Sequence, residues 1–330
     1  MSVLLSSLKI GSLNLSNRLV MPPMATSKAG SDGELTEDIV NYYEEKSKGG
    51  YIGLIIIEHS YISKAGKASN HQLSISRDSD IEPLKKLAKT IQNNGSKAVM
   101  QINHAGGSTK EEVTGLTPEA PSAIENPYTK LVTKELSKED IKKVIADFAE
   151  AARRVKEAGF DAVEIHSAHG YLLNQFYSPI FNKRTDEYGG DILNRIRIHL
   201  EVIKAVKEAV GHDFPVLLRL GALDYIDGGS QLEDAKIAAK EFEKAGVSIL
   251  DISGGFRGFT VPDFNEQGYF YPVTEELKKI VSTPILLTGG VVDATAAEQL
   301  LESKKADLIG VGRPILKDSE WAKNAIESLQ

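Results

Sequence analysis

Short apolar runs rich in β-branched residues alternate with longer helix-like segments eight times along the chain, and this alternation limits the fold more than any other feature. The runs are nearly continuous, as is typical of parallel strands buried on both faces. Several helical segments end on glycine, for example at "NNG" and "KAG", where helices commonly stop. The apolar runs span residues 18–25, 53–60, 97–106, 161–170, 215–224, 247–255, 284–290 and 306–314.

Eight consecutive strand–helix units predict an α/β fold of the (β/α)₈ TIM barrel type, with residues 1–330 as a single domain. A doubly wound open sheet is the alternative. The opening stretch "LKIGSLNLSN" alternates like a small hairpin, which we expect to close the bottom of the barrel. Long irregular stretches follow strands three and four, near residues 105–136 and 167–190. Both belong to the face on which barrel active sites lie.

Composition excludes several kinds of chemistry. The chain has no cysteine, so disulfides, iron–sulfur clusters, thiolate zinc sites and cysteine nucleophiles are excluded. A net charge of -7 without a long basic run argues against nucleic acid or an anionic membrane as the main partner. No window holds about 18 consecutive apolar residues, and no basic start precedes an apolar core, which predicts a cytoplasmic protein. The sequence leaves a homo-oligomer open.

The chemically distinctive residues stand directly after the apolar runs, at ends that would converge on one mouth in a barrel. The ends of strands seven and eight, "LLTGGV" and "IGVGRP", predict a phosphate site. There Gly289, Gly290 and Gly312 would let backbone N–H groups approach an anion, and Arg313 would add charge. The alternative is that these glycines only make tight turns.

Two further polar residues stand inside apolar runs. Arg219, in "VLLRLG", needs an anionic or carbonyl partner, because an unpaired buried guanidinium costs several kcal/mol, roughly. Residue chemistry leaves two readings equally open: an internal ion pair with Glu164 or Asp251, or an electron-rich ligand. Gln101 could offer an amide donor and acceptor to a heterocycle.

The segment "EIHSAHGYLLNQF" places His166 and His169 three residues apart at the end of a strand. The pair could bind a metal together with Glu164, could be structural at a helix start, or could be hydrogen-bond donors aimed at a ligand. The segment lacks the H-E-x-x-H spacing of a common zinc site.

Several of these segments together resemble the flavin-binding segments of the Old Yellow Enzyme family of ene-reductases. They include "NRLVMPPMA", "QINHAG", "HSAHGYLLNQFYSPIFNKRTDEYGG", "LLRLGALD", "LLTGG" and "IGVGRP", and the likeness covers nearly the whole chain. The resemblance implies an enzyme that uses NADPH or NADH and non-covalent FMN to reduce electron-poor alkenes, with hydride transfer from flavin N5. Enones, enals, nitroalkenes and enoates are the expected acceptors.

The resemblance also implies residue roles. Pro23, Met24 and Ala25 would contact the flavin ring, Gln101 and Arg219 its pyrimidine edge, and Gly289, Gly290, Gly312 and Arg313 its phosphate. His166 and His169 would bind the substrate carbonyl, and Tyr171 would donate the proton. No metal ligand is implied.

The chain departs from the family pattern at three positions beside the expected flavin. Ala25 stands where cysteine or threonine is common, Ser27 where a tyrosine is found, and His59 where the residue is usually small. Whether Thr26 replaces the effect lost at Ala25 is open. Two other functions compete: a metal-dependent barrel lyase or isomerase using His166, His169 and Glu164, and a phosphate-sugar binding or scaffolding barrel without redox chemistry.

Overall fold

Eight parallel strands close into a barrel in the computed structural model, which describes residues 2–126 and 129–330. The order around the barrel follows the chain and excludes the open sheet, so the (β/α)₈ prediction is confirmed. The strands are β3 (Leu19–Met21), β4 (Leu54–Tyr61), β5 (Lys97–Asn103), β8 (Ala162–Ser167), β9 (Val216–Leu223), β10 (Ile249–Gly254), β11 (Ile285–Thr288) and β12 (Leu308–Gly310).

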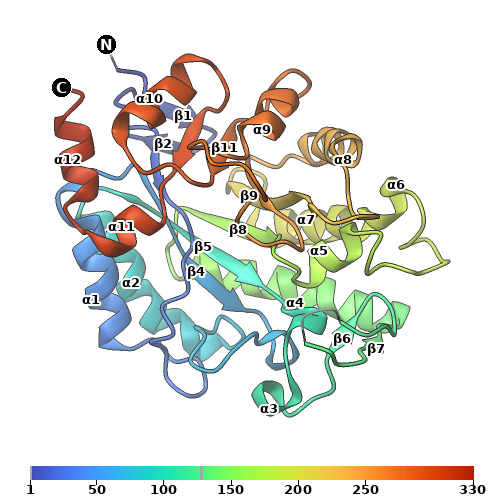
Figure 1. Cartoon of the computed structure of the whole chain (residues 1–330). Coiled ribbons are helices and arrows are strands. Elements are labelled where there is room, and N and C mark those ends of the chain that lie inside the picture. The colour runs from blue at the N-terminus through green and yellow to red at the C-terminus, as the bar shows by residue number, and fades with distance from the viewer. Residues whose placement is uncertain (1, 127–128) are drawn as a thin grey trace.

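Helices follow the strands and surround the barrel (Figure 1). Helix α4 shows why these segments are helical. Ser137 caps its first turn, and Ile141, Val144 and Phe148 form a buried stripe along it. Gly159, just after the helix, has φ +78° and ends it. The main helices are α1 (Glu37–Ser47), α2 (Ile81–Asn93), α4 (Lys138–Glu157), α7 (Arg197–Val210), α8 (Leu232–Lys244), α9 (Tyr271–Lys278), α10 (Ala294–Glu302), α11 (Arg313–Lys317) and α12 (Trp321–Glu327).

Two apolar layers explain the continuous apolar runs of the strands. Along β11, Leu286 joins the cluster inside the barrel, whereas Ile285 and Leu287 join the cluster between strands and helices. Because successive side chains point to opposite faces, a strand covered on both sides needs apolar residues at every position.

The predicted hairpin is present as β1 (Leu8–Ile10) and β2 (Leu13–Leu15). Ile10, Leu13 and Leu15 belong to the cluster inside the barrel. Ser12 donates a hydrogen bond to the carbonyl of Asp213, just before β9 begins. The hairpin therefore closes the end of the barrel at which the strands start.

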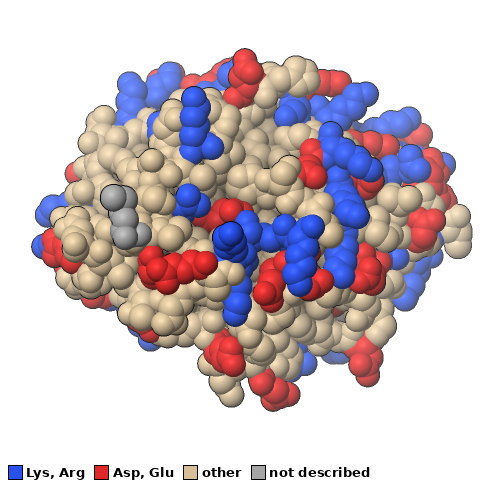
Figure 2. Space-filling view, turned by 90° about the horizontal axis from the view of Figure 1, so that it is seen from above, with Lys and Arg blue, Asp and Glu red and all other residues tan. Residues whose placement is uncertain are grey.

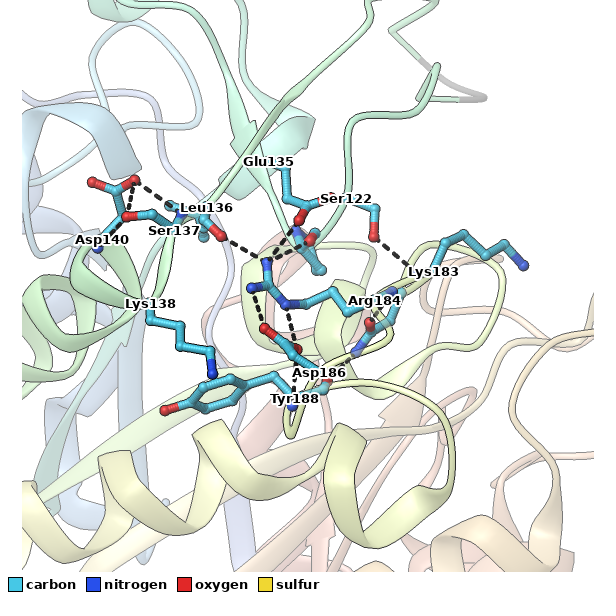
Figure 3. Close-up of polar contacts among 12 residues, drawn as sticks. Ser122, Glu135, Leu136, Ser137, Lys138, Asp140, Lys183, Arg184, Asp186 and Tyr188 are labelled. Atoms are coloured by element: carbon cyan, nitrogen blue, oxygen red, sulfur yellow. Dashed lines mark hydrogen bonds and ion pairs between the residues drawn. The ribbon is translucent and has the colours of Figure 1, made fainter.

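The long loops after β5 and β8 pack against each other. The first contains helix α3 (Glu111–Thr114) and the short strands β6 (Glu119–Ala120) and β7 (Lys134–Glu135), which lie together beside the barrel (Figure 1). Arg184 from the second loop joins the two (Figure 3). Its guanidinium donates to the carbonyls of Pro121 and Leu136 at 2.9 and 2.6 Å and holds Asp186 through two further bonds. Such paired bonds to a carboxylate fix geometry as well as adding stability.

Acidic and basic side chains are interspersed over the face of the molecule that Figure 2 shows. Among the described residues, we find no helix with both the length and the apolar character needed to cross a membrane.

Candidate functional site

A cavity of about 520 Å³ lies at the carboxyl ends of the strands and brings all the predicted site residues together. These residues come from six of the eight barrel strands or the loops that follow them, so only closure of the barrel makes them neighbours. The predicted residues in its wall are Pro23, Met24, Ala25, Gln101, His166, His169, Tyr171, Arg219, Gly289, Gly290, Gly312 and Arg313.

Strand β8 presents His166 to the cavity, and the loop after it presents His169 and Tyr171. His169 and Gly170 both have positive φ, at +59° and +75°, so the chain turns sharply there. Gly170 is held on both sides: its N–H donates to Asn174, and its carbonyl accepts from Ser108 and the Gln175 amide at 2.7 Å each. This support fixes a left-handed conformation that non-glycine residues rarely adopt.

Both histidines are neutral, and each has one ring nitrogen without a protein partner among the described residues. The N–H of Ala168 donates to Nδ1 of His166 at 3.2 Å, so the proton of the neutral ring is on Nε2. Nε2 of His169 lies 2.8 Å from the Ser253 hydroxyl, which leaves Nδ1 free to contact a ligand. Nδ1 carries the ring proton when the Ser253 hydroxyl donates to Nε2. Burial, with contributions from Arg219 and His59, lowers the pKa of both rings well below the usual value.

Tyr171 lies edge-on to His166, with ring centroids 5.1 Å apart and planes at 87°. Its hydroxyl has no hydrogen-bond partner among residues 2–126 and 129–330. Burial raises the pKa of Tyr171, so the phenol keeps its proton at neutral pH.

Arg219 forms the floor of the cavity and is only 4% exposed. Its Nε lies 3.2 Å from Oδ2 of Asp251, its neighbour across the β9–β10 ladder, without the alignment of a hydrogen bond. One of the two interpretations of Arg219 was an internal ion pair, and this pair is present with Asp251. The same guanidinium also faces the cavity. Within the described part of the chain, it makes no hydrogen bond to protein.

Glu164 does not pair with Arg219. Its Oε1 accepts a 2.8 Å hydrogen bond from the amide of Gln101, its neighbour across the β5–β8 ladder, and its Oε2 has no partner in the described structure. Burial and the nearby Asp251 raise the pKa of Glu164 well above its usual range, which favours the neutral acid. No three histidine or acidic side chains of the described residues are grouped to hold a metal ion. The arrangement therefore gives no support to a lyase that uses His166, His169 and Glu164.

The glycine turns after β11 and β12 expose backbone to the cavity. Gly290 has φ +74°, and a Cβ there would lie 2.4 Å from the Tyr269 ring. Its N–H and that of Val291 have no acceptor in the residues described. Arg313 is exposed beside Tyr269 and forms no ion pair in the same part of the chain. Free N–H groups next to an unpaired cation suit an anion.

Other wall residues were not predicted as site residues. Phe259 and Tyr269 come from the loop between β10 and α9. The many aromatic and glycine residues of this loop were the feature of the sequence that could have pointed to these two wall residues. His59 was noted at a strand end but given no role, and it lines the cavity. Thr26 does not take the place of a side chain at Ala25, because its hydroxyl donates to Glu58 at 2.7 Å and it does not line the cavity.

A second cavity, of about 410 Å³, lies beside His104 and helix α4. Its wall combines lysines and carboxylates, and it contains none of the predicted site residues. We therefore place the candidate site in the cavity over the barrel mouth.

The barrel and its cavity define a class of protein: a (β/α)₈ barrel whose cavity has glycine turns and Arg313 at strands seven and eight, together with neutral histidines. Residues 4–330 match the model of the NADH:flavin oxidoreductase / NADH oxidase family, and the chain belongs to this family. The resemblance to a flavin-dependent oxidoreductase is thereby confirmed at the level of the family.

Individual comparisons agree. The chain is 40% identical to the NADPH dehydrogenase of Listeria monocytogenes, over 100% of this chain and 96% of that protein. It is 39% identical to the NADH oxidase of Thermoanaerobacter brockii over 99% of its length, but it spans only 51% of that relative. An Old Yellow Enzyme homologue from Zymomonas mobilis superposes with a TM-score of 0.87 at 28% identity, over 99% of this chain and 93% of the other.

Proposed function

We propose that the chain is an FMN-dependent oxidoreductase that uses NADPH or NADH to reduce carbon–carbon double bonds conjugated to a carbonyl or nitro group. Residues 1–330 would act as one FMN-binding barrel domain. The observation that carries the proposal is Arg219: a buried guanidinium on the cavity floor, without a hydrogen bond to the described protein, opposite the neutral donors His166 and His169. Asp251 balances the charge of this guanidinium, but its N–H groups have no hydrogen-bond acceptor in the described protein, which favours an electron-rich ligand.

The cavity fits FMN at both ends. Gly289, Gly290, Gly312 and Arg313 offer backbone N–H groups and a cation to a phosphate. At the other end, Arg219 and Gln101 would hold the polar edge of the ring. The amide oxygen of Gln101 accepts no hydrogen bond within the described residues, so it can accept one from a ring N–H. Pro23, Met24 and Ala25 give the ring an apolar wall.

FMN, when bound, supplies hydride chemistry: it takes a hydride from a nicotinamide and gives one to an electron-poor carbon. The protein supplies the groups that receive the substrate. His166 and His169 would donate to the carbonyl oxygen and stabilise the negative charge that develops there. In comparable oxyanion sites each donor contributes about 3 kcal/mol.

Tyr171 would provide the proton for the second carbon of the former double bond. Its phenol is protonated, because burial raises its pKa, and its hydroxyl has no competing partner in the described structure. A positioned general acid contributes roughly 10²–10⁴-fold to such a step.

The test is cofactor identity and its dependence on Arg219. We expect the purified protein to be yellow and to release FMN on heating, as identified by chromatography. Arg219→Ala should weaken FMN binding at least about tenfold, since it removes the buried cation, whereas Arg257→Ala, an exposed arginine on the loop after β10, should not. Release of FAD would refute the choice of FMN. Failure to bind FMN on reconstitution would refute the proposal and favour the non-redox barrel.

A further inference from the structure

His59 is a cavity residue that the proposed mechanism leaves without a role. It lies near the end of β4, where the pairing of β4 with β5 shifts register between Ile57 and Ser60. Such a bulge commonly redirects a side chain beside an active site. Here the His59 ring stacks on Tyr171, with centroids 5.5 Å apart and planes at 23°, and lies 6.3 Å from the ring of His166.

Hydrogen bonds behind the ring fix its tautomer. Oε1 of Gln72 accepts from the N–H of Ala68 at 2.7 Å, so the amide nitrogen of Gln72 must face His59. That nitrogen donates to Nδ1 of His59 at 2.9 Å and to the His59 carbonyl at 3.1 Å. Nδ1 is therefore an acceptor, and the proton of the neutral ring is on Nε2.

The ring is neutral at the pH at which the protein would work. Burial, followed by the positive charge of Arg219, lowers the pKa of His59 to about 4. Asn103 places a second amide nitrogen 3.3 Å from the same Nδ1, which again presents a donor to that atom. His59 thus offers one N–H, on the side of the ring away from Gln72.

The number of donors exceeds what one carbonyl can use. A carbonyl oxygen has two lone pairs, and His166 and His169 would occupy both. Among the described residues, no aspartate or glutamate lines the cavity to accept from His59. An N–H that loses water when substrate enters and finds no new acceptor weakens substrate binding. A second acceptor oxygen on the substrate would remove this cost.

We propose that His59 determines specificity by binding a second oxygen of the substrate, so that the site prefers electron-poor alkenes with two acceptor oxygens. The second oxygen can belong to a carboxylate or to a second carbonyl group. This inference rests on the proposed alkene reduction.

The test compares acceptors that differ by one oxygen. Maleimide and 3-pyrrolin-2-one differ by one carbonyl, and cinnamate and cinnamaldehyde differ by a carboxylate in place of an aldehyde. His59→Phe keeps a ring to stack on Tyr171 but removes the N–H. We expect kcat/KM to fall for a two-oxygen acceptor roughly tenfold or more beyond the fall for its one-oxygen partner. The affected pair shows whether a carbonyl or a carboxylate is bound.

His212→Phe, at an exposed histidine after α7, is the matched control and should change neither ratio. Equal losses for all four acceptors would mean that His59 only positions Tyr171, and unchanged ratios would mean that it does not contact substrate. Either result overturns the proposal.

The tautomer is measured independently of turnover. In protein labelled with ¹⁵N-histidine, the signals lost in His59→Phe should show a neutral ring protonated on Nε2 at pH 7. A ring protonated on Nδ1, or a charged ring, would overturn the inference even in an active enzyme. A protein that binds no flavin would instead refute the proposed function, and the substrate class with it, while the spectra still report on His59.

Discussion

Individual residues of the cavity combine two arginines, Arg219 and Arg313, with neutral polar side chains. Arg219 forms an ion pair with Asp251, whereas Glu164 is favoured as the neutral acid. Because burial penalises charge, the histidines opposite are neutral and each offers a single N–H. The histidine side of the cavity is therefore uncharged while Arg219 places a guanidinium at its floor, which suits the proposed reaction, in which the ligand becomes negative.

Tyr171→Phe should separate the two halves of the proposed reaction. Oxidation of the nicotinamide needs no proton from this phenol, so its rate should be nearly unchanged. Reduction of a simple enone should slow by roughly 10²–10⁴-fold, because the general acid is missing. Stopped-flow measurement of each half separately checks this. Equal slowing of both halves would show a general disturbance of the site, and the assignment of the proton donor would be withdrawn.

At the scale of elements, the strand-to-helix turns supply the backbone of the site. The turn after β11 depends on Gly290, which combines positive φ with a close approach to Tyr269. Gly159, after α4, also has positive φ, at +78°, but a Cβ added there would meet no described atom within 4 Å. Both glycines have a left-handed backbone, but only Gly290 lies close to another side chain, so Gly159 serves as a control for Gly290.

Gly290→Ala and Gly159→Ala should differ in their effect on cofactor binding. Both should lower the free energy of unfolding by about 1–2 kcal/mol, the cost of a left-handed non-glycine residue. Only Gly290→Ala should also weaken FMN binding, at least roughly tenfold, since the turn must shift away from Tyr269. Titration of the FMN-free proteins with FMN measures this. Equal FMN affinities in the two variants would contradict a phosphate site at this turn.

For the whole molecule, buried histidines and buried carboxyl groups have opposite effects on how the free energy of unfolding changes with pH. Burial lowers the pKa of histidines such as His199, to about 3, and raises that of carboxyl groups such as Glu58 and Glu164. As the pH falls below about 6.5, unfolded histidines bind protons that the folded ones cannot, and stability is lost. The raised carboxyl groups act the other way, because the folded protein keeps protons that the unfolded chain releases above about pH 4.3.

His199 allows one such contribution to be isolated, because it lies outside the cavity, where Nε2 is 2.8 Å from the Ser167 hydroxyl and joins α7 to β8. The difference in unfolding free energy between wild type and His199→Gln should fall as the pH decreases from about 6.5 to about 5. We expect a slope of up to about 1.4 kcal/mol per pH unit. Urea unfolding at several pH values, at saturating FMN, measures it. Parallel curves would mean that His199 takes up protons in the folded state.

The sequence alone determined the barrel and predicted twelve residues of the cavity wall, though not Phe259 or Tyr269. Strand and helix periodicity, glycine stops and turn glycines are set by neighbouring residues, so eight units and their polar ends could be predicted. Barrel closure then obliges those ends to meet, which is why residues as distant as Pro23 and Arg313 share one cavity.

Only the tertiary structure decided how the side chains of the site are paired and protonated. In the structure, Arg219 pairs with Asp251, and Gln101 donates to Glu164. Thr26 donates to Glu58, and Gln72 fixes the tautomer of His59. The physical reason is that residues far apart in the chain form a hydrogen bond or an ion pair only when the distance between their polar atoms is correct to within a few tenths of an ångström, roughly. Such distances follow from strand register and burial, which no local pattern of residues records.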